Sequence, residues 1–251
     1  MDKDNKRILM SLDISTTTIG CCLLLDDGTD YGKIIELTHV KPKVSKKIKG
    51  IESLFLKAKI FNEQFLQKWK DLKIDNIIIE EPLLRSNNVN TVGTLLRFNG
   101  ILSKDCYDTF GIVPEYISSY DARKYAFPEL MSVRKFGKDD KAYDKKKIIN
   151  SVNKTQFVLF GEYLWDCDKK LILQDKVSKI YPNIEWVYDK KGNLRIENFD
   201  VTDSLVAVLG WLNKEKYGEP IFNVSNIKID EKKIDFKVNF WNREIDKTIY
   251  F

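Results

Sequence analysis

The sequence predicts an α/β protein with a mixed sheet, and three observations support this prediction. Residues 7–14 and 19–25 are nearly continuous apolar runs, which are typical of strands buried on both faces. Apolar residues then recur every three or four positions over 51–72, as on a helix that packs against a sheet. A third buried run follows at 74–80. Strands that alternate with helices in this way place the helices on the faces of a sheet.

The first three strands are expected to form an antiparallel meander. The short linker 15–18 and Gly20 indicate an antiparallel return, and the Asp-Gly turn signal within 26–30 precedes a third strand at about 33–40. The remaining core elements are expected in the order helix at 51–72, strand at 74–80, helix at 87–110, strand at 112–118 and helix at 200–215. The prediction is therefore a five-stranded mixed sheet flanked by helices.

The segment before the last core helix is less regular and is expected to be an insertion at about 128–199. It contains a predicted helix near 145–160 and a hairpin signal at 186–196. Residues 227–251 alternate apolar and polar side chains, as in one or two added strands. We therefore predict one domain over 1–217 and a β-rich C-terminal extension over 218–251, packed on the same domain.

Composition limits the classes of function. The chain has 251 residues, of which 43% are hydrophobic, and this is enough to form a sizeable core. Its formal charge of +5 favours a polyanionic partner. The start of the chain is too polar for a secretory signal, and no apolar stretch approaches the roughly 18 residues of a membrane span. We expect a cytoplasmic protein with no membrane partner and no small-molecule cofactor.

Catalysis, if the protein is an enzyme, is expected to depend on carboxylates. The four cysteines show no Cys-x-x-Cys spacing, which indicates reduced thiols. His39 is the single histidine, which excludes His-rich metal sites and makes any Ser-His-Asp arrangement depend on that residue.

Two carboxylates stand at the ends of predicted buried strands. Asp13 interrupts an apolar strand, where an unpaired charge would cost several kcal/mol. A hydrogen bond to the following turn, an ion pair or a metal ion would each compensate it. Glu80 ends the run 74–80, and Glu81 and Pro82 follow. Because successive side chains in a strand point to opposite faces, one of the two glutamates can share a face with Asp13, and we predict Glu80.

Two more carboxylates begin the last core helix. Asp200 and Asp203 are three residues apart, so both can face one side of the first turn. Taken alone, this spacing is explained better by helix capping and the helix dipole. Ala207 and Gly210 continue the stripe and would let that face approach the sheet closely. The predicted geometry brings both aspartates beside the two strand carboxylates.

Four converging carboxylates would repel one another unless cations neutralise them. Oxygen ligands favour Mg²⁺ or Mn²⁺ over Zn²⁺. Two such ions about 4 Å apart can activate a water and stabilise the leaving oxygen of a phosphodiester. The expected cofactor is therefore a pair of Mg²⁺ ions, with Mn²⁺ as a substitute.

Three segments together resemble a known family. Residues 13–20, 77–80 and 200–207, in this order, are similar to the acidic motifs of the RuvC-like Holliday junction resolvases of the ribonuclease H fold, and 96–100 is similar to the helix motif after that family's glutamate. The long stretch after Phe127 looks like phage or other viral versions.

The resemblance implies a homodimeric, Mg²⁺-dependent endodeoxyribonuclease that nicks branched DNA in recombination and repair, in a bacterial or virus-infected host cell. It implies these catalytic and metal-binding residues: Asp13, Glu80, Asp200 and Asp203. Leu83 stands where bacterial members often place an aromatic residue near the branch point.

Basic residues after the fifth strand are the predicted DNA surface, because the family places phosphate-binding lysines there. Tyr120, Tyr125 and Phe127 are candidates for stacking on bases, although core packing is the better explanation of each. The predicted DNA-binding residues are Leu83, Arg85, Arg123, Lys124, Lys135, Lys138, Lys145, Lys146 and Lys147.

Two other classes of function compete with a nuclease. Actin-like and sugar-kinase phosphotransferases share the hairpin after the first strand, but they need a second glycine-rich phosphate loop, and the 12 glycines here include no Gly-Gly pair. A non-catalytic nucleic-acid-binding protein on a nuclease fold is the other alternative. The presence of all four carboxylates favours the enzyme over it.

Overall fold

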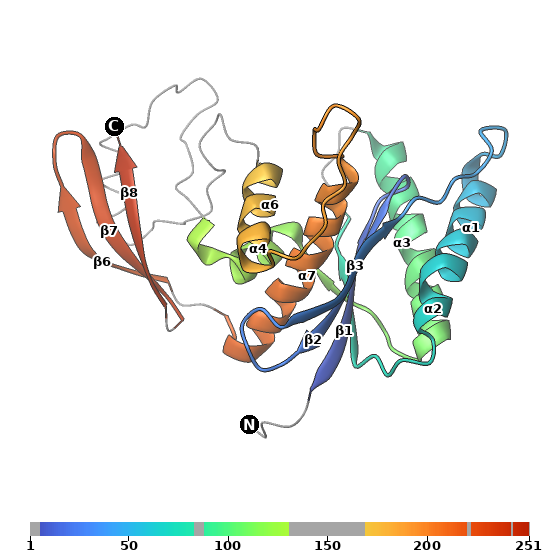
Figure 1. Ribbon diagram of the computed structural model, residues 1–251, viewed down its shortest axis with the longest axis horizontal. Helices are drawn as coiled ribbons and strands as arrows, with labels where there is room; N and C mark the ends of the chain where they lie inside the picture. Colours follow the sequence, from blue (N-terminus) through green and yellow to red (C-terminus); the bar gives the residue numbers. More distant parts are fainter. Residues whose placement is uncertain (1–5, 83–87, 131–168, 220–221, 242, 251) are drawn as a thin grey trace. The chain divides into compact units, whose positions relative to one another are not determined.

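The computed structural model describes residues 6–82, 88–130, 169–219, 222–241 and 243–250. Its main sheet has the strand order β3-β2-β1-β4-β5, so the first strand is central (Figure 1). β1 pairs antiparallel with β2 and parallel with β4, which confirms the predicted mixed sheet and the opening meander. The strands are β1 (Arg7–Ile14), β2 (Ile19–Asp26), β3 (Lys33–Val40), β4 (Asn76–Glu80) and β5 (Glu115–Ile117).

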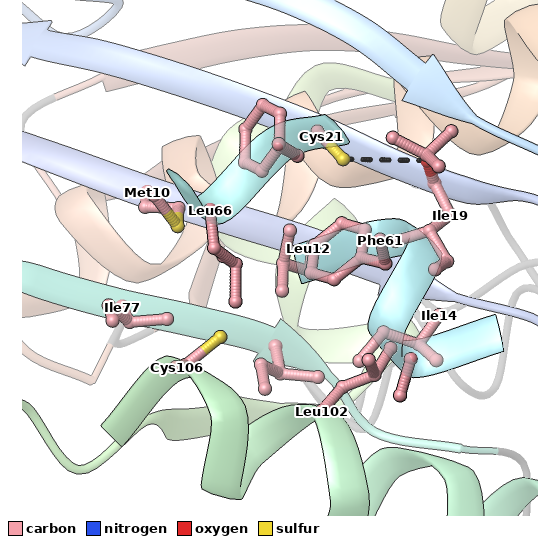
Figure 2. Close-up of a cluster of buried hydrophobic side chains, with 14 of the residues drawn as sticks. Met10, Leu12, Ile14, Ile19, Cys21, Phe61, Leu66, Ile77, Leu102 and Cys106 are labelled. Atoms are coloured by element: carbon pink, nitrogen blue, oxygen red, sulfur yellow. Dashed lines mark hydrogen bonds between the residues drawn. The ribbon is translucent and has the colours of Figure 1, made fainter. Parts of the chain in front are cut away.

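Helices α1 and α3 cover one face of this sheet (Figure 1). The amphipathic stripe predicted over 51–72 forms α1 (Gly50–Phe61), the π-helical turn η1 (Asn62–Leu66) and α2 (Gln67–Trp69). Asn88 caps α3 (Val89–Phe110) by accepting from two backbone amides, and Gly111 ends it in the left-handed conformation with φ 71°. These helices bury alternate strand residues in one apolar cluster, part of which is drawn in Figure 2.

The other face is covered by α7 (Glu197–Tyr217), which begins three residues before the predicted start. It meets the sheet through the buried hydroxyl of Ser11, which donates to the carbonyl of Ser204 at 2.6 Å. Two further helices, α4 (Ser119–Ala126) and α6 (Lys169–Ile180), and a short 3₁₀ turn η2 (Pro128–Leu130) were not predicted. The helix predicted near 145–160 lies outside the described residues.

Contacts within the chain divide it into two compact units, Met1–Ala126 with Leu173–Leu212, and Phe127–Ile172 with Asn213–Phe251. In the second unit, β6 (Phe222–Ile229), β7 (Lys233–Phe240) and β8 (Arg243–Tyr250) form an antiparallel sheet. Alternate β7 residues are buried, as the sequence pattern indicated, but the extension has three strands rather than one or two. The prediction that it packs on the main domain stays a prediction.

In the described part of the chain, no helix combines the length and the apolar character needed to cross a membrane.

Candidate carboxylate site at the ends of the central strands

Asp13 and Glu80 lie on the same face of the sheet at the ends of neighbouring strands. In the parallel pair β1–β4, Leu12 is opposite Ile79, and Asp13 and Glu80 are the next residues of the two strands. Leu12 and Ile79 belong to the apolar cluster under α1 and α3, so alternation turns Asp13 and Glu80 toward α7. Glu81 is the next residue after Glu80, so it does not share the face of Asp13 and Glu80, and it is exposed.

The N-terminal turn of α7 reaches the same face through Gly20. Gly20 is directly opposite Asp13 in the β1–β2 pair, so a side chain there would share its face. A Cβ atom at position 20 would lie 2.0 Å from the carbonyl oxygen of Asp200. No side chain fits in that space, and the Asp200 backbone therefore packs directly on the strand beside Asp13.

A second contact fixes the direction of the helix along the strand. Ser11, two residues before Asp13, bonds the carbonyl of Ser204, one turn after Asp200. Both Ser11 and Ser204 are fully buried. The two contacts together hold the beginning of α7 next to the end of β1, which brings Asp200 close to the position of Asp13.

Asp203 faces a different neighbour. Its side chain is 7% exposed and accepts from the guanidinium of Arg123 on α4 at 3.4 Å. Gly210, two turns later on α7, is close to the backbone of Ala122, where a Cβ would lie 2.5 Å from the carbonyl oxygen. The small residue at 210 therefore lets α7 approach α4, and the expectation that it serves approach to the sheet was wrong. Asp203 therefore has a basic partner in Arg123.

Glu197 is a site residue that the sequence analysis missed. Its carboxylate is 4% exposed and forms ion pairs with Arg195 at 2.6 Å and with Lys41, which follows β3. The charge of Asp200 also acts on Lys41, which places this lysine near the first turn of α7. Burial, followed by Lys41 and Arg195, lowers the pKa of His39. The available sequence signal was an acidic residue three positions before Asp200.

Oxygen donors on one face suit a hard divalent cation. Among the described residues, however, no three or more His, Cys, Asp or Glu side chains form a group able to hold a metal ion. The fold thus brings Asp13, Glu80 and Asp200 to one region, while Asp203 is engaged by Arg123. In the positions described, these side chains do not form a metal site.

The predicted DNA-binding residues are only partly described. Arg123 lies at the carboxylate site, and Lys124 stands over the ring of Tyr125 at 4.7 Å. Tyr125 and Phe127 are buried, so these two aromatic residues pack in the interior, whereas Tyr120 is 42% exposed. The other predicted residues lie outside the described residues: Leu83, Arg85, Lys135, Lys138, Lys145, Lys146 and Lys147.

No family model and no curated protein sequence matches the chain. Among solved structures, it is similar to RuvC of T. thermophilus in complex with a Holliday junction substrate, with a TM-score of 0.54 and 10% identity over 84% of this chain and 96% of that one. The protein has a ribonuclease H-like fold. A second Thermus thermophilus RuvC structure gives a TM-score of 0.49 with 12% identity over 84% and 96% of the two chains. A Ppx/GppA family member of Aquifex aeolicus gives 0.38 with 9% identity over 84% and 90%.

Structural similarity at 10% sequence identity shows the fold, but it does not transfer the role of any residue. The chemistry of the site therefore has to be argued from its own residues. Asp13, Glu80 and Asp200 supply acidic oxygens at the strand ends, and Lys41, Arg195 and Arg123 supply positive charge around them. In such a region the cations can attract a phosphate, whereas the carboxylates can contribute to phosphodiester chemistry only by holding a divalent cation.

Proposed function

We propose that the protein is a Mg²⁺-dependent, structure-selective endodeoxyribonuclease that resolves Holliday junctions or related branched DNA. The observation that supports this most is the meeting of Asp13, Glu80 and the Asp200 turn of α7 on one face of a ribonuclease H-like sheet. The similar RuvC chain was solved with a Holliday junction substrate, which makes branched DNA the first substrate to test.

In this proposal the roles of the residues follow from their charges. Asp13, Glu80, Asp200 and Asp203 would hold divalent cations, and bound Mg²⁺ would supply activation of water and stabilisation of the leaving oxygen. Arg123 competes for Asp203, so cation binding includes a rearrangement of that ion pair. Lys41 and Arg195 attract the DNA backbone toward the strand ends.

The deciding experiment incubates the purified protein with a synthetic four-way junction and a matched linear duplex in Mg²⁺. We expect nicks in the junction and none in the duplex. Mn²⁺ should replace Mg²⁺, while Ca²⁺ should not, because its coordination is larger and looser. Asp13→Asn should reduce cleavage by orders of magnitude and leave junction binding intact, since removing negative charge cannot weaken attraction to phosphate.

A homodimer is part of the proposal, because two-fold symmetry matches the two equivalent strands of a junction. The candidate interface, chosen from the resemblance to the RuvC-like family, is α3. Sedimentation of the protein alone and on junction DNA tests this. A monomer under both conditions would remove the dimer from the proposal.

A second candidate is a nucleic-acid-binding protein that does not cut. The engagement of Asp203 by Arg123 and the absence of a metal-holding group among the described side chains favour it. The same incubation separates the two candidates. Junction binding without any Mg²⁺-dependent or Mn²⁺-dependent nick would support the second one.

A further inference from the structure

A hydrogen-bonded hairpin over residues 186–196 stands directly before α7, and we call it the 186–196 hairpin. It is the orange loop at the N-terminal end of α7 in Figure 1. Tyr188 and Leu194 form its β-bridge, and the amide of Arg195 donates to the carbonyl of Val187 at 3.0 Å. Gly192 takes the left-handed conformation with φ 81° at the tip, which glycine adopts without strain.

The tip is held by the side chain of Asp189. One carboxylate oxygen accepts from the amides of Lys191 at 2.7 Å and Asn193 at 2.9 Å, and the other accepts from the Asn193 side chain at 3.2 Å. These bonds lower the pKa of Asp189, with the backbone bond from Asn193 as the largest cause. The single acidic residue of the tip is therefore used to hold the turn.

The base of the hairpin is clamped to the first turn of α7. Asn198 is 3% exposed, and its side chain both accepts from the Val187 amide at 3.1 Å and donates to the Val187 carbonyl at 2.7 Å. Asn198 is two residues before Asp200. The hairpin thus has a fixed position relative to the helix turn that carries Asp200.

The surface of the hairpin combines exposed apolar side chains with cations. Tyr188 is 54% exposed and Ile196 is 71% exposed. Exposed apolar groups that gather on one surface can mark a binding site. Lys190 and Lys191 are exposed at the tip. Arg195 lies at the base of the hairpin, next to α7. Glu197 forms ion pairs with both Arg195 and Lys41 there.

We propose that the 186–196 hairpin binds the DNA strand that enters the carboxylate site, with Tyr188 stacked on an unpaired base and Lys190 and Lys191 on backbone phosphates. This deepens the proposed function and rests on it. An exposed aromatic ring beside cations is the combination that holds unpaired nucleotides, since every base offers a stacking face and every nucleotide a charge. A branch point supplies such bases, whereas a linear duplex keeps its bases stacked.

Charge decides between DNA and a protein partner. From Tyr188 to Ile196 the hairpin carries Lys190, Lys191 and Arg195 against Asp189. The carboxylate of Asp189 is bonded within the turn and Arg195 is paired with Glu197, so the two exposed lysines set the charge of the tip. A purely apolar docking surface would not need two exposed lysines beside an exposed tyrosine. A polyanionic partner with exposed bases, such as branched DNA, would contact both the tyrosine ring and the lysines.

The test uses the full chain carrying Asp13→Asn, so that binding is measured without cleavage. The probes are a four-way junction with 2-aminopurine at the branch point and a matched linear duplex. Binding of the Asp13→Asn protein should change the fluorescence of 2-aminopurine, because Tyr188 stacks on the unpaired base. Adding Tyr188→Ala should remove this change and lower junction affinity about 5- to 100-fold, as expected for one lost stacking contact. Tyr188→Phe should keep both. Phe55→Ala removes an aromatic ring that is 57% exposed on α1, a helix with no part in the proposed site or interface, and serves as the matched control.

The lysines are tested by salt dependence. Lys190→Ala with Lys191→Ala should flatten the slope of log affinity against log salt by roughly one to two units. Lys70→Ala with Lys73→Ala removes the same charge beyond α2 and should leave the slope unchanged. If the parent protein binds junction DNA and the hairpin variants bind it equally well, the hairpin proposal is overturned while the proposed function stands. If the parent binds neither DNA, the proposed function fails and the hairpin proposal with it.

Discussion

The carbonyl oxygen of Asp200 occupies the space that a side chain at Gly20 would need, 2.0 Å from the position of its Cβ atom. Gly20 is also the cross-strand partner of Asp13. One glycine therefore lets the first turn of α7 reach the strand that carries a candidate catalytic carboxylate. The contact is between backbone atoms, so no flexible side chain can move aside to make room for a larger residue at position 20.

We expect Gly20→Ala to destabilise the protein by about 1–3 kcal/mol, as other overpacked cores do, and to displace the Asp200 turn. Gly100→Ala is the matched control, because its Cβ would meet nothing within 4 Å on the exposed side of α3. That change should stabilise α3 by up to about 1 kcal/mol through helix propensity. Denaturant unfolding of the two variants measures both effects, and equal stabilities would contradict the packing described.

A neighbouring pair of glutamates tests the phase of β4. Glu80→Gln should abolish most Mg²⁺-dependent cleavage if the protein is the nuclease proposed, because Glu80 shares a face with Asp13. Glu81→Gln removes the same charge one residue later and should retain nearly all activity. Nicking rates on one junction substrate give the comparison. Equal losses would mean that net charge, rather than position on the sheet, controls the reaction.

The strands could be predicted from the sequence because each buried strand is a local run of apolar residues. The sequence also indicated the phase that places Glu80 rather than Glu81 toward α7, since alternation in a strand is a local property. It did not reveal α4, whose eight residues include two buried alanines and one buried tyrosine and so show little apolar periodicity. It also missed the pairing of Lys41 with Glu197, because an ion pair between residues far apart in the chain leaves no local pattern.

The pKa of His39 predicts a dependence of stability on pH. Burial first, and then Lys41 and Arg195, hold this pKa below the value of about 6.5 expected in the unfolded chain. Between the lowered pKa and about 6.5 the unfolded chain binds more protons, so the free energy of unfolding should fall as pH drops through this window. His39→Gln should remove that dependence. Unfolding curves at a series of pH values would refute this if both proteins lost stability in parallel.

The ion pair between Arg123 and Asp203 distinguishes a metal ligand from a structural carboxylate. The side chain of Asp203 is 7% exposed, so Arg123→Ala should cost about 1–3 kcal/mol of stability. If Asp203 also binds cations, removing the nearby guanidinium should raise the affinity for Mn²⁺, because a like charge no longer opposes the ion. Arg123→Lys keeps the charge and should leave Mn²⁺ affinity close to that of the parent. Calorimetric titration of the folded variants with Mn²⁺ measures this, and an affinity unchanged by Arg123→Ala would assign Asp203 to the structural contact with α4 alone.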